Sequence, residues 1–536
     1  MAGAFFKPKK AATFFRDTPP PSGLTWRENE AAFGGAFTRE KLLRFDVKQE
    51  SYQLAFLFVS LFTLVLYVRP QELFPQFFEA YPIQLAKIFA IAAPVAFFAA
   101  RWLAGEKLFL WTKELQMAFA ILAMALLFYP FSIEKADTWK EWNENYLRVF
   151  LVFAILIGTL YSRERIYWLM RITVLSGAWI ALDTILRYHA GEFSGDTKVL
   201  QRVVSSVGGM FGNPNDLATA FGMLLPPAVV LLVLSRGYLK LLYAACIVLF
   251  LIATLVTFSR GGFLALAAVV GVMLWKFRKR HRAIPWVAGA LLTSVLLLAA
   301  PGGLGDRLWT ILRPNADATG SAQERKDNLK RGVLIFLRHP LFGIGMGTFH
   351  NMAIKDRRAH NSYLEIAAEL GVPGLLAYLL LIFNPLKALW KIERETVGAR
   401  DRRAAENYLL SVALQGTLVA YYVNSFFASI QYVWFVYFPV AYAVGLRRIY
   451  EREEEVRARV NAPEHLAEFQ VGDENTGTFW KTRRPGVVFE KNDGKTARPD
   501  DEASEGQSLV QSPRPPVAPS DPSNPSTHGT AAGVRQ

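Results

Sequence analysis

Long apolar runs are the feature that most constrains what this chain can fold into. About 20 apolar residues in a helix cross a hydrocarbon layer roughly 30 Å thick. The chain has 536 residues, of which 52% are hydrophobic, and its mean hydropathy is +0.20. Runs of spanning length occur at about 51–68, 83–104, 115–131, 146–161, 166–186, 215–235, 239–258, 261–276, 284–300, 362–384, 405–424 and 430–446. The sequence therefore predicts an all-α membrane protein, a polytopic bundle of about twelve transmembrane helices.

Basic residues in the short loops predict the orientation of this bundle. If the N-terminus is cytoplasmic, the inner loops carry most of the Lys and Arg, including "KFRKRHR" at 276–282, whereas the short outer loops carry few. Such a positive-inside bias places both termini in the cytoplasm. The segment 301–361 then forms one long external loop between the ninth and tenth helices.

The two ends of the chain differ in composition from the apolar region. Residues 1–48 mix charges with "TPPPSG", and the C-terminal end is rich in Pro, Ser and charge. Such segments bury too little apolar surface to order themselves. We predict a cytoplasmic N-terminal tail at 1–48, a transmembrane domain at 49–447 and a cytoplasmic, mostly disordered tail at 448–536.

Charge and cysteine content exclude several classes of protein. The net charge of +15 fits anionic lipid of the inner leaflet better than nucleic acid, because the basic residues gather beside helix ends and no nucleic-acid motif accompanies them. Cys246 is the single cysteine and lies in an apolar run. An intramolecular disulfide and a cysteine zinc cluster are therefore excluded.

A first polar group precedes the predicted helix at 215–235. In "QRVVSSVGGMFGNPNDLATAF", Asn213 stands as an N-cap, Pro214 takes the first helical position and Asp216 follows in the first turn. Arg202 lies just upstream, on the predicted external side. It is either an anion-binding side chain or a loop arginine beside a well-formed cap.

Arg260 forms a second group, in "TLVTFSRGGFLALAAVV". It lies in the tight turn between two predicted helices, where Gly261 and Gly262 permit close backbone approach. A guanidinium group matches phosphate geometry and stays charged at physiological pH. The alternative is an arginine that extends to the membrane interface.

The third group is the stretch "RRAHNSYLEIAAELG". Ser362 and Glu365 have the spacing of a capping box, which predicts that a helix begins at Ser362 with His360 just before it. The positive helix end, with Arg357 and Arg358, should disfavour imidazolium and lower the pKa of His360, so that the neutral ring can accept a proton. The alternative is an ordinary surface histidine.

Four motifs together resemble the O-antigen ligase and O-antigen polymerase superfamily. They are "GMFGNPNDLA", "TFSRGGFLAL", "RHPLFGIGMGTF" and "HNSYLEIAAELGVPGLL", which occur in this order with a long external loop before the last. The resemblance covers roughly 200–385, and "YVRPQELFP" at 67–75 is similar as well. It is specific for the superfamily and not for one member.

The resemblance implies a membrane glycosyltransferase that uses a polyprenyl-diphosphate-linked glycan at the periplasmic face of the bacterial inner membrane. It implies neither a metal nor another cofactor, and no nucleotide sugar. By motif position, Arg202 and Arg260 would bind the diphosphate and His360 would be the catalytic base that activates the acceptor hydroxyl. A ligase would transfer the finished glycan to a lipid A-core or other acceptor.

Other residues of the long loop allow further interpretations. The charges at 323–331 precede an apolar stretch, which predicts an amphipathic helix resting on the membrane over the site. Arg325 on this helix would either bind the glycan or diphosphate or face solvent. The external carboxylates show no paired arrangement typical of a glycosidase, and His339, His350 and His360 lack a zinc-site spacing.

Two alternatives to a ligase remain open at this stage. A polymerase would use the same donor with a second lipid-linked repeat unit as acceptor. A membrane transporter, from another class, should show intramembrane charges lining a path. Lys87, Arg171 and Asp183 are the main candidates for such charges.

Overall fold

A computed structural model describes residues 52–81, 83–193, 202–278, 321–353, 358–399, 401–460, 470–473, 478–481 and 490–491. The chain divides into two compact units, Met1–Arg459 and Val460–Gln536. The helices are α3 (Gln53–Val68), α4 (Pro70–Leu73), α5 (Pro75–Ala80), α6 (Leu85–Leu103), α7 (Lys113–Leu127), η2 (Tyr129–Phe131), α8 (Lys135–Lys140), η3 (Glu141–Tyr146), α9 (Leu147–Thr159), α10 (Arg163–His189), η4 (Gly209–Phe211), α11 (Pro214–Leu234), α12 (Tyr238–Val256), α13 (Arg260–Phe277), α16 (Ser321–Arg338), α17 (Phe349–Met352), α18 (Ser362–Thr396), α19 (Arg402–Asn424) and α20 (Tyr437–Val460).

The helical membrane character is confirmed, but the count of about twelve spans is not. Within the described residues, 7 helical stretches are long and apolar enough to cross a membrane. They are Gln53–Leu73, Leu85–Leu103, Arg163–His189, Pro214–Leu234, Tyr238–Val256, Arg260–Phe277 and Ser362–Thr396. The predicted helix at 284–300, the tail at 1–48 and much of the predicted loop at 301–361 lie outside the described residues.

The last predicted span begins later than expected. The apolar run at 430–446 predicts a helix from its first residue, whereas α20 starts at Tyr437. The preceding backbone is bound by other groups: Ile430 donates its N–H to Ser362 Oγ at 2.9 Å. Ala428 offers its carbonyl to the same hydroxyl at 2.8 Å. These tertiary bonds replace helical ones over the start of the run.

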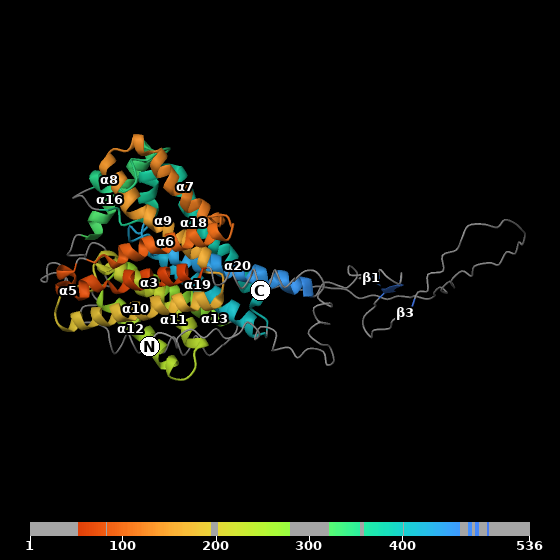
Figure 1. Cartoon of the computed structure of the whole chain (residues 1–536). Helices are drawn as coiled ribbons and strands as arrows, with labels where there is room; N and C mark the ends of the chain where they lie inside the picture. Colours follow the sequence, from red (N-terminus) through yellow and green to blue (C-terminus); the bar gives the residue numbers. More distant parts are fainter. Residues whose placement is uncertain are drawn as a thin grey trace, which may run out of the picture. The chain divides into compact units, whose positions relative to one another are not determined.

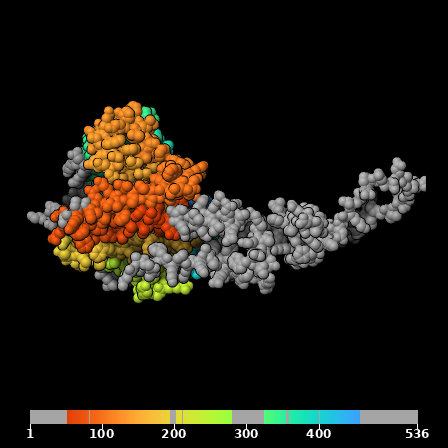
Figure 2. All heavy atoms as spheres, viewed as in Figure 1, coloured from red at the N-terminus to blue at the C-terminus, as the bar shows by residue number. Residues whose placement is uncertain are grey.

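Within the first unit, α11 is the central helix of the bundle. It packs against α10, α12, α13 and α19. Of the residues in its most apolar stretch, 78% are buried inside the protein. Figure 1 shows these helices running side by side. By contrast, only 17% of the residues in the most apolar stretch of α6 are buried, and this helix exposes Ile91, Val95 and Leu103. Such a face suits contact with lipid tails, and the N-terminal helices, red to orange, form most of the face seen in Figure 2.

A break in α18 receives the glycine-rich motif at 338–349. Gly371 has φ 66° and interrupts the helix, so the carbonyls of Ala368 and Glu369 accept bonds of 3.0 Å from the N–H groups of Ile344 and Gly345. Gly343 also has positive φ, and a Cβ there would lie 2.2 Å from the Glu369 carbonyl oxygen. This contact fixes the end of α16 against α18.

The second unit contains three short strands among its described residues. They are β1 (Gln470–Asp473), β2 (Thr478–Lys481) and β3 (Glu490–Lys491), in one antiparallel sheet of order β1-β2-β3. The segment predicted to be mostly disordered thus includes these strands. The predicted boundary at 447/448 falls inside α20, which continues to Val460.

Candidate active site

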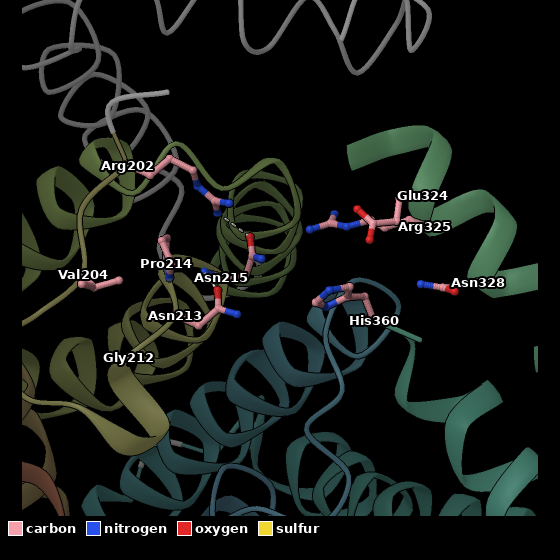
Figure 3. A pocket seen from close by; sticks show the side chains of 10 residues that line it. All are labelled: Arg202, Val204, Gly212, Asn213, Pro214, Asn215, Glu324, Arg325, Asn328 and His360. Carbon is pink, nitrogen blue, oxygen red and sulfur yellow. Dashed lines mark hydrogen bonds between the residues drawn. The ribbon is translucent and has the colours of Figure 1, made fainter. Parts of the chain in front are cut away.

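Three of the four predicted site residues meet in one cavity of about 320 Å³. Its walls come from the loop before α11, from the start of α11, from α16 and from the segment before α18. In Figure 3, His360 lies between the α11 side and the α16 side. The lining residues are Arg202, Val204, Gly212, Asn213, Pro214, Asn215, Glu324, Arg325, Asn328 and His360.

The N-terminus of α11 forms one wall and carries the cap that its sequence predicts. Asn213 accepts a hydrogen bond of 2.8 Å from Asn215 N–H through its side chain, and Pro214 takes the first helical position. Asn215 joins two segments, because its Oδ1 accepts from Arg202 Nη2 at 2.9 Å and from Ser259 Oγ at 2.8 Å. The arginine is therefore tied to two helix ends.

The loop that carries Arg202 is anchored by a carboxylate from α10. Asp183 accepts from Ser205 Oγ at 2.7 Å, from Ser206 N–H at 2.8 Å and from Ser206 Oγ at 3.0 Å. Arg187 adds a contact of 3.3 Å to the same carboxylate. Asp183 was one of the mid-helix charges expected to line a path in a transporter, and here it anchors a loop instead.

Arg260 is placed close to this network but does not line the cavity. It is the first residue of α13, and the preceding Ser259 caps that helix by accepting from Gly262 N–H at 3.2 Å. The same serine hydroxyl donates to Asn215. Arg260 is thus one residue away from the network that binds Arg202.

The predicted close approach at Gly261 and Gly262 is confirmed. A Cβ added at Gly262 would lie 2.3 Å from Ala218 Cβ on α11, and one added at Gly261 would lie 2.8 Å from Phe427 Cβ. Neither position has room for a side chain without displacing backbone. These contacts hold the beginnings of α11 and α13 together.

Gly262→Ala should therefore lower stability, whereas the matched change Gly271→Ala on the same helix should not. A Cβ at Gly271 meets nothing within 4 Å. Overpacking should cost Gly262→Ala about 1–3 kcal/mol of unfolding free energy, while Gly271→Ala should gain up to ~1 kcal/mol from helix propensity. Thermal unfolding of the purified variants measures both, and equal midpoints would contradict the packing argument.

The opposite wall is the first half of α16. Glu324, Arg325 and Asn328 line the cavity, and Asn328 is buried. Gly332 packs on α18, where an added Cβ would lie 2.7 Å from a methyl of Leu364. The second half of α16 exposes Val333 and Leu337, as the amphipathic prediction requires. Its placement on a membrane stays a prediction.

His360 has an uncommon backbone conformation at the edge of the cavity. Its φ is 51°, in the left-handed region that few residues other than glycine adopt. Its N–H donates to Ser429 Oγ at 3.1 Å. Strained residues of this kind persist where the surroundings over-determine them, and they gather at functional sites.

The helix after His360 begins at Ser362 as predicted, but the capping box is wrong. Asn361 is the N-cap and accepts from Leu364 N–H at 3.0 Å. Ser362 instead binds the segment before α20. Glu365 accepts from Ala359 N–H at 3.1 Å rather than from the N-cap residue. Asn361 and Ser362 are adjacent and both have side chains that can cap a helix. Ser362 binds Ala428 and Ile430 instead, so Asn361 is the residue that caps α18.

The cationic surroundings predicted for His360 are partly offset. Arg357 lies outside the described residues. The Arg358 guanidinium comes within 3.9 Å of Glu365. Partial burial opposes the charge of Arg358, but the carboxylates of Glu365, Glu141 and Glu369 outweigh this effect and raise the pKa of Arg358 above its ordinary value. The Glu365 carboxylate thus lies beside the segment that carries His360, and its negative charge was not part of the prediction for this histidine.

No group of three His, Cys, Asp or Glu side chains within the described residues is placed to bind a metal ion. The cavity offers guanidinium, amide and imidazole groups, together with the carboxylate of Glu324. The guanidinium and amide groups suit anionic ligands, and the amides, the imidazole and the carboxylate suit hydroxyl groups.

Comparison with protein families agrees with the motifs. Residues 245–379 match the family model described as O-antigen ligase. The resemblance to the O-antigen ligase superfamily is confirmed. No curated protein matches the chain.

The segment matched to the O-antigen ligase family includes most of the candidate site. Arg260, Arg325 and His360 lie inside 245–379, and Arg202 lies outside it. The sequence did not single out Asn215, Asp183 or Glu365 as supports of these residues. Asn215 and Glu365 belong to the motifs quoted above, so their polar side chains beside predicted site residues were the available signal.

Proposed function

We propose that this chain transfers a glycan from a polyprenyl-diphosphate carrier to a hydroxyl group of a lipid A-core or other acceptor at the periplasmic face of the bacterial inner membrane. The main support for this proposal is the cavity that brings Arg202, Arg325 and His360 together from three separate segments. The O-antigen ligase match at 245–379 supports the same reaction class.

The α11 side of the cavity would bind the diphosphate. Arg202 is oriented by Asn215, and the N-terminus of α11 lines the cavity beside it. The diphosphate gains negative charge as it leaves, and fixed guanidinium groups with the positive end of a helix stabilise that charge. Arg260 would contribute from the start of α13, which shares the hydrogen bonds of Asn215 and Ser259.

His360 would be the general base on the opposite side of the donor sugar. Its neutral ring takes the proton of the acceptor hydroxyl while the acceptor oxygen forms a bond to the anomeric carbon. The bond from that carbon to the phosphate oxygen breaks, and the diphosphate leaves with the electron pair. One direct displacement predicts inversion at the anomeric carbon. The step as proposed uses no metal and no nucleotide sugar.

Deletion of the gene followed by glycan analysis tests the proposed role. Loss of a ligase should leave long glycan chains on the polyprenyl carrier and none on the final acceptor. Re-expression of the chain should restore the transfer. Loss of a polymerase would instead leave single repeat units on the final acceptor, and that result would replace the ligase proposal with its alternative. Unchanged glycans on both carrier and acceptor would contradict both.

A further inference from the structure

Glu365 is a buried carboxylate directly behind the histidine segment. Its side chain is 2% exposed. Its Oε2 accepts from Ala359 N–H at 3.1 Å and from the Ser429 hydroxyl, and its Oε1 accepts from Gln431 Nε2 at 3.0 Å. The carboxylate therefore joins the start of α18 to the residue before His360 and to the segment before α20.

Ser429 extends this contact to His360 itself. The serine hydroxyl donates to Glu365 and accepts from His360 N–H at 3.1 Å. The backbone N–H groups of Ala359 and His360 are thus both oriented by one carboxylate, the first directly and the second through Ser429. The bond from Ala359 to Glu365 is buried and the two bonds of Ser429 are partly buried. Hydrogen bonds to charged groups are stronger away from water.

The backbone of His360 requires this support. At φ 51° it lies in the left-handed region, which is disfavoured for a residue with a Cβ and is stabilised by surrounding contacts. The ring of His360 reaches the cavity from this conformation. Relaxation to an ordinary φ would rotate the Cα–Cβ bond and move the ring.

We infer that Glu365 is a positioning residue that sets the place of His360 in the cavity. The catalytic consequence rests on the proposed function, in which His360 is the base. The structural consequence does not, because it concerns only the backbone at Ala359 and His360. The two can therefore be tested separately.

Glu369 provides a matched control one helical turn further along α18. It is 1% exposed, and its Oε1 accepts from Phe349 N–H at 3.1 Å, in a different segment. Removing either carboxylate deletes a buried acid from the same helix. Only the removal of Glu365 deletes the hydrogen-bond acceptor of Ala359 and Ser429.

Hydrogen exchange on the full-length purified chain tests the structural part. In Glu365→Ala, the amides of Ala359 and His360 should exchange at least about 10-fold faster than in the wild type, because their acceptors are lost or released. In Glu369→Ala, these two amides should exchange at the wild-type rate. Wild-type exchange in Glu365→Ala, or equal acceleration in both variants, would overturn the positioning role.

Two milder variants serve if Glu365→Ala does not fold. Ser429→Ala should accelerate exchange at His360 and leave Ala359 protected, since Glu365 still accepts from Ala359. Glu365→Gln should keep most of the protection at both amides. Its single acceptor oxygen can serve Ala359, and Gln431 can turn its buried, unpartnered Oε1 toward the new amide nitrogen. Protection at His360 in Ser429→Ala would count against the bridge.

Transfer kinetics test the catalytic part with the same proteins. Glu365→Ala should lower kcat by about 100-fold, as for a displaced catalytic group, with little change in KM for the donor and with recovery in Glu365→Gln. A rise in KM for the donor without loss of kcat would overturn the catalytic part of the inference. Faster exchange at His360 with unchanged kcat would leave the positioning role intact and remove His360 from the proposed chemistry.

Discussion

Replacement of His360 by glutamine is expected to reduce transfer by about 10²–10⁴-fold, the contribution of a general base. Glutamine can hydrogen-bond the acceptor hydroxyl but cannot take its proton at neutral pH. Donor binding should be largely retained, because Arg202 and Arg325 occupy other parts of the cavity wall. Turnover and donor affinity, measured with purified protein, separate these two effects. Near-normal turnover would reduce His360 to a residue that positions the acceptor.

His350→Gln is the matched control for that substitution. His350 lies in α17, its Nδ1 is 3.0 Å from the Gly347 carbonyl oxygen and its Nε2 is 3.6 Å from Asp137. It does not line the described cavity. Its replacement should leave turnover near the wild-type value. Equal losses in both variants would indicate general damage to the protein.

The pH dependence of the wild type should follow from the same role. The base is the neutral imidazole, so the rate should fall as pH drops through the histidine pKa, ordinarily ~6.5, and level off above it. This holds where the chemical step limits turnover. A rate that stays flat from about pH 5 to 8 under that condition would contradict base catalysis by His360.

Replacement of Arg202 by lysine is expected to lower kcat/KM by roughly 10- to 100-fold, the worth of a charged hydrogen bond. Lysine keeps the charge but loses the planar fork that binds phosphate oxygens. The guanidinium also donates to Asn215 Oδ1 at 2.9 Å, a bond that a lysine ammonium would make only in a different geometry. Arg202→Ala should lose more. Arg331→Ala, an exposed arginine of α16 outside the cavity wall, should leave transfer unchanged.

Arg260 offers a comparison within the same measurement. If it binds the diphosphate, Arg260→Lys and Arg260→Ala should both impair transfer while the protein still inserts. Wild-type activity in both variants would instead identify an arginine that extends to the membrane interface. Since Arg260 lies beside the cavity rather than in its wall, its replacement should lower transfer less than the replacement of Arg202.

Helix ends were predictable where local signals acted alone. Asn213 and Pro214 begin α11 as their side chains dictate, and the glycines after Arg260 meet a neighbouring helix as their size permits. Prediction failed where distant groups intervened. Ser362 binds the segment before α20 instead of capping its own helix, and that segment forgoes helical bonds in return.

The site was predictable as a set of residues but not as an arrangement. Each of Arg202, Arg325 and His360 stood out as a polar group beside an apolar run. Their meeting in one cavity depends on the break at Gly371 and on the contact of Gly332 with Leu364, which place α16 over the start of α18. Asp183 binds Ser206, 23 residues away, and Glu365 binds Ser429, 64 residues away, so no local pattern indicated these partners.

The proposed function requires that this chain alone moves a glycan from polyprenyl diphosphate to an acceptor. The most direct test incubates the purified full-length chain with a polyprenyl-diphosphate-linked glycan and a lipid A-core acceptor, and analyses both lipids by mass spectrometry. We expect transferred glycan on the acceptor and free polyprenyl diphosphate in equal amounts, and neither product with His360→Gln. An unchanged donor with the wild-type chain, under conditions where the donor binds, would contradict the proposed function.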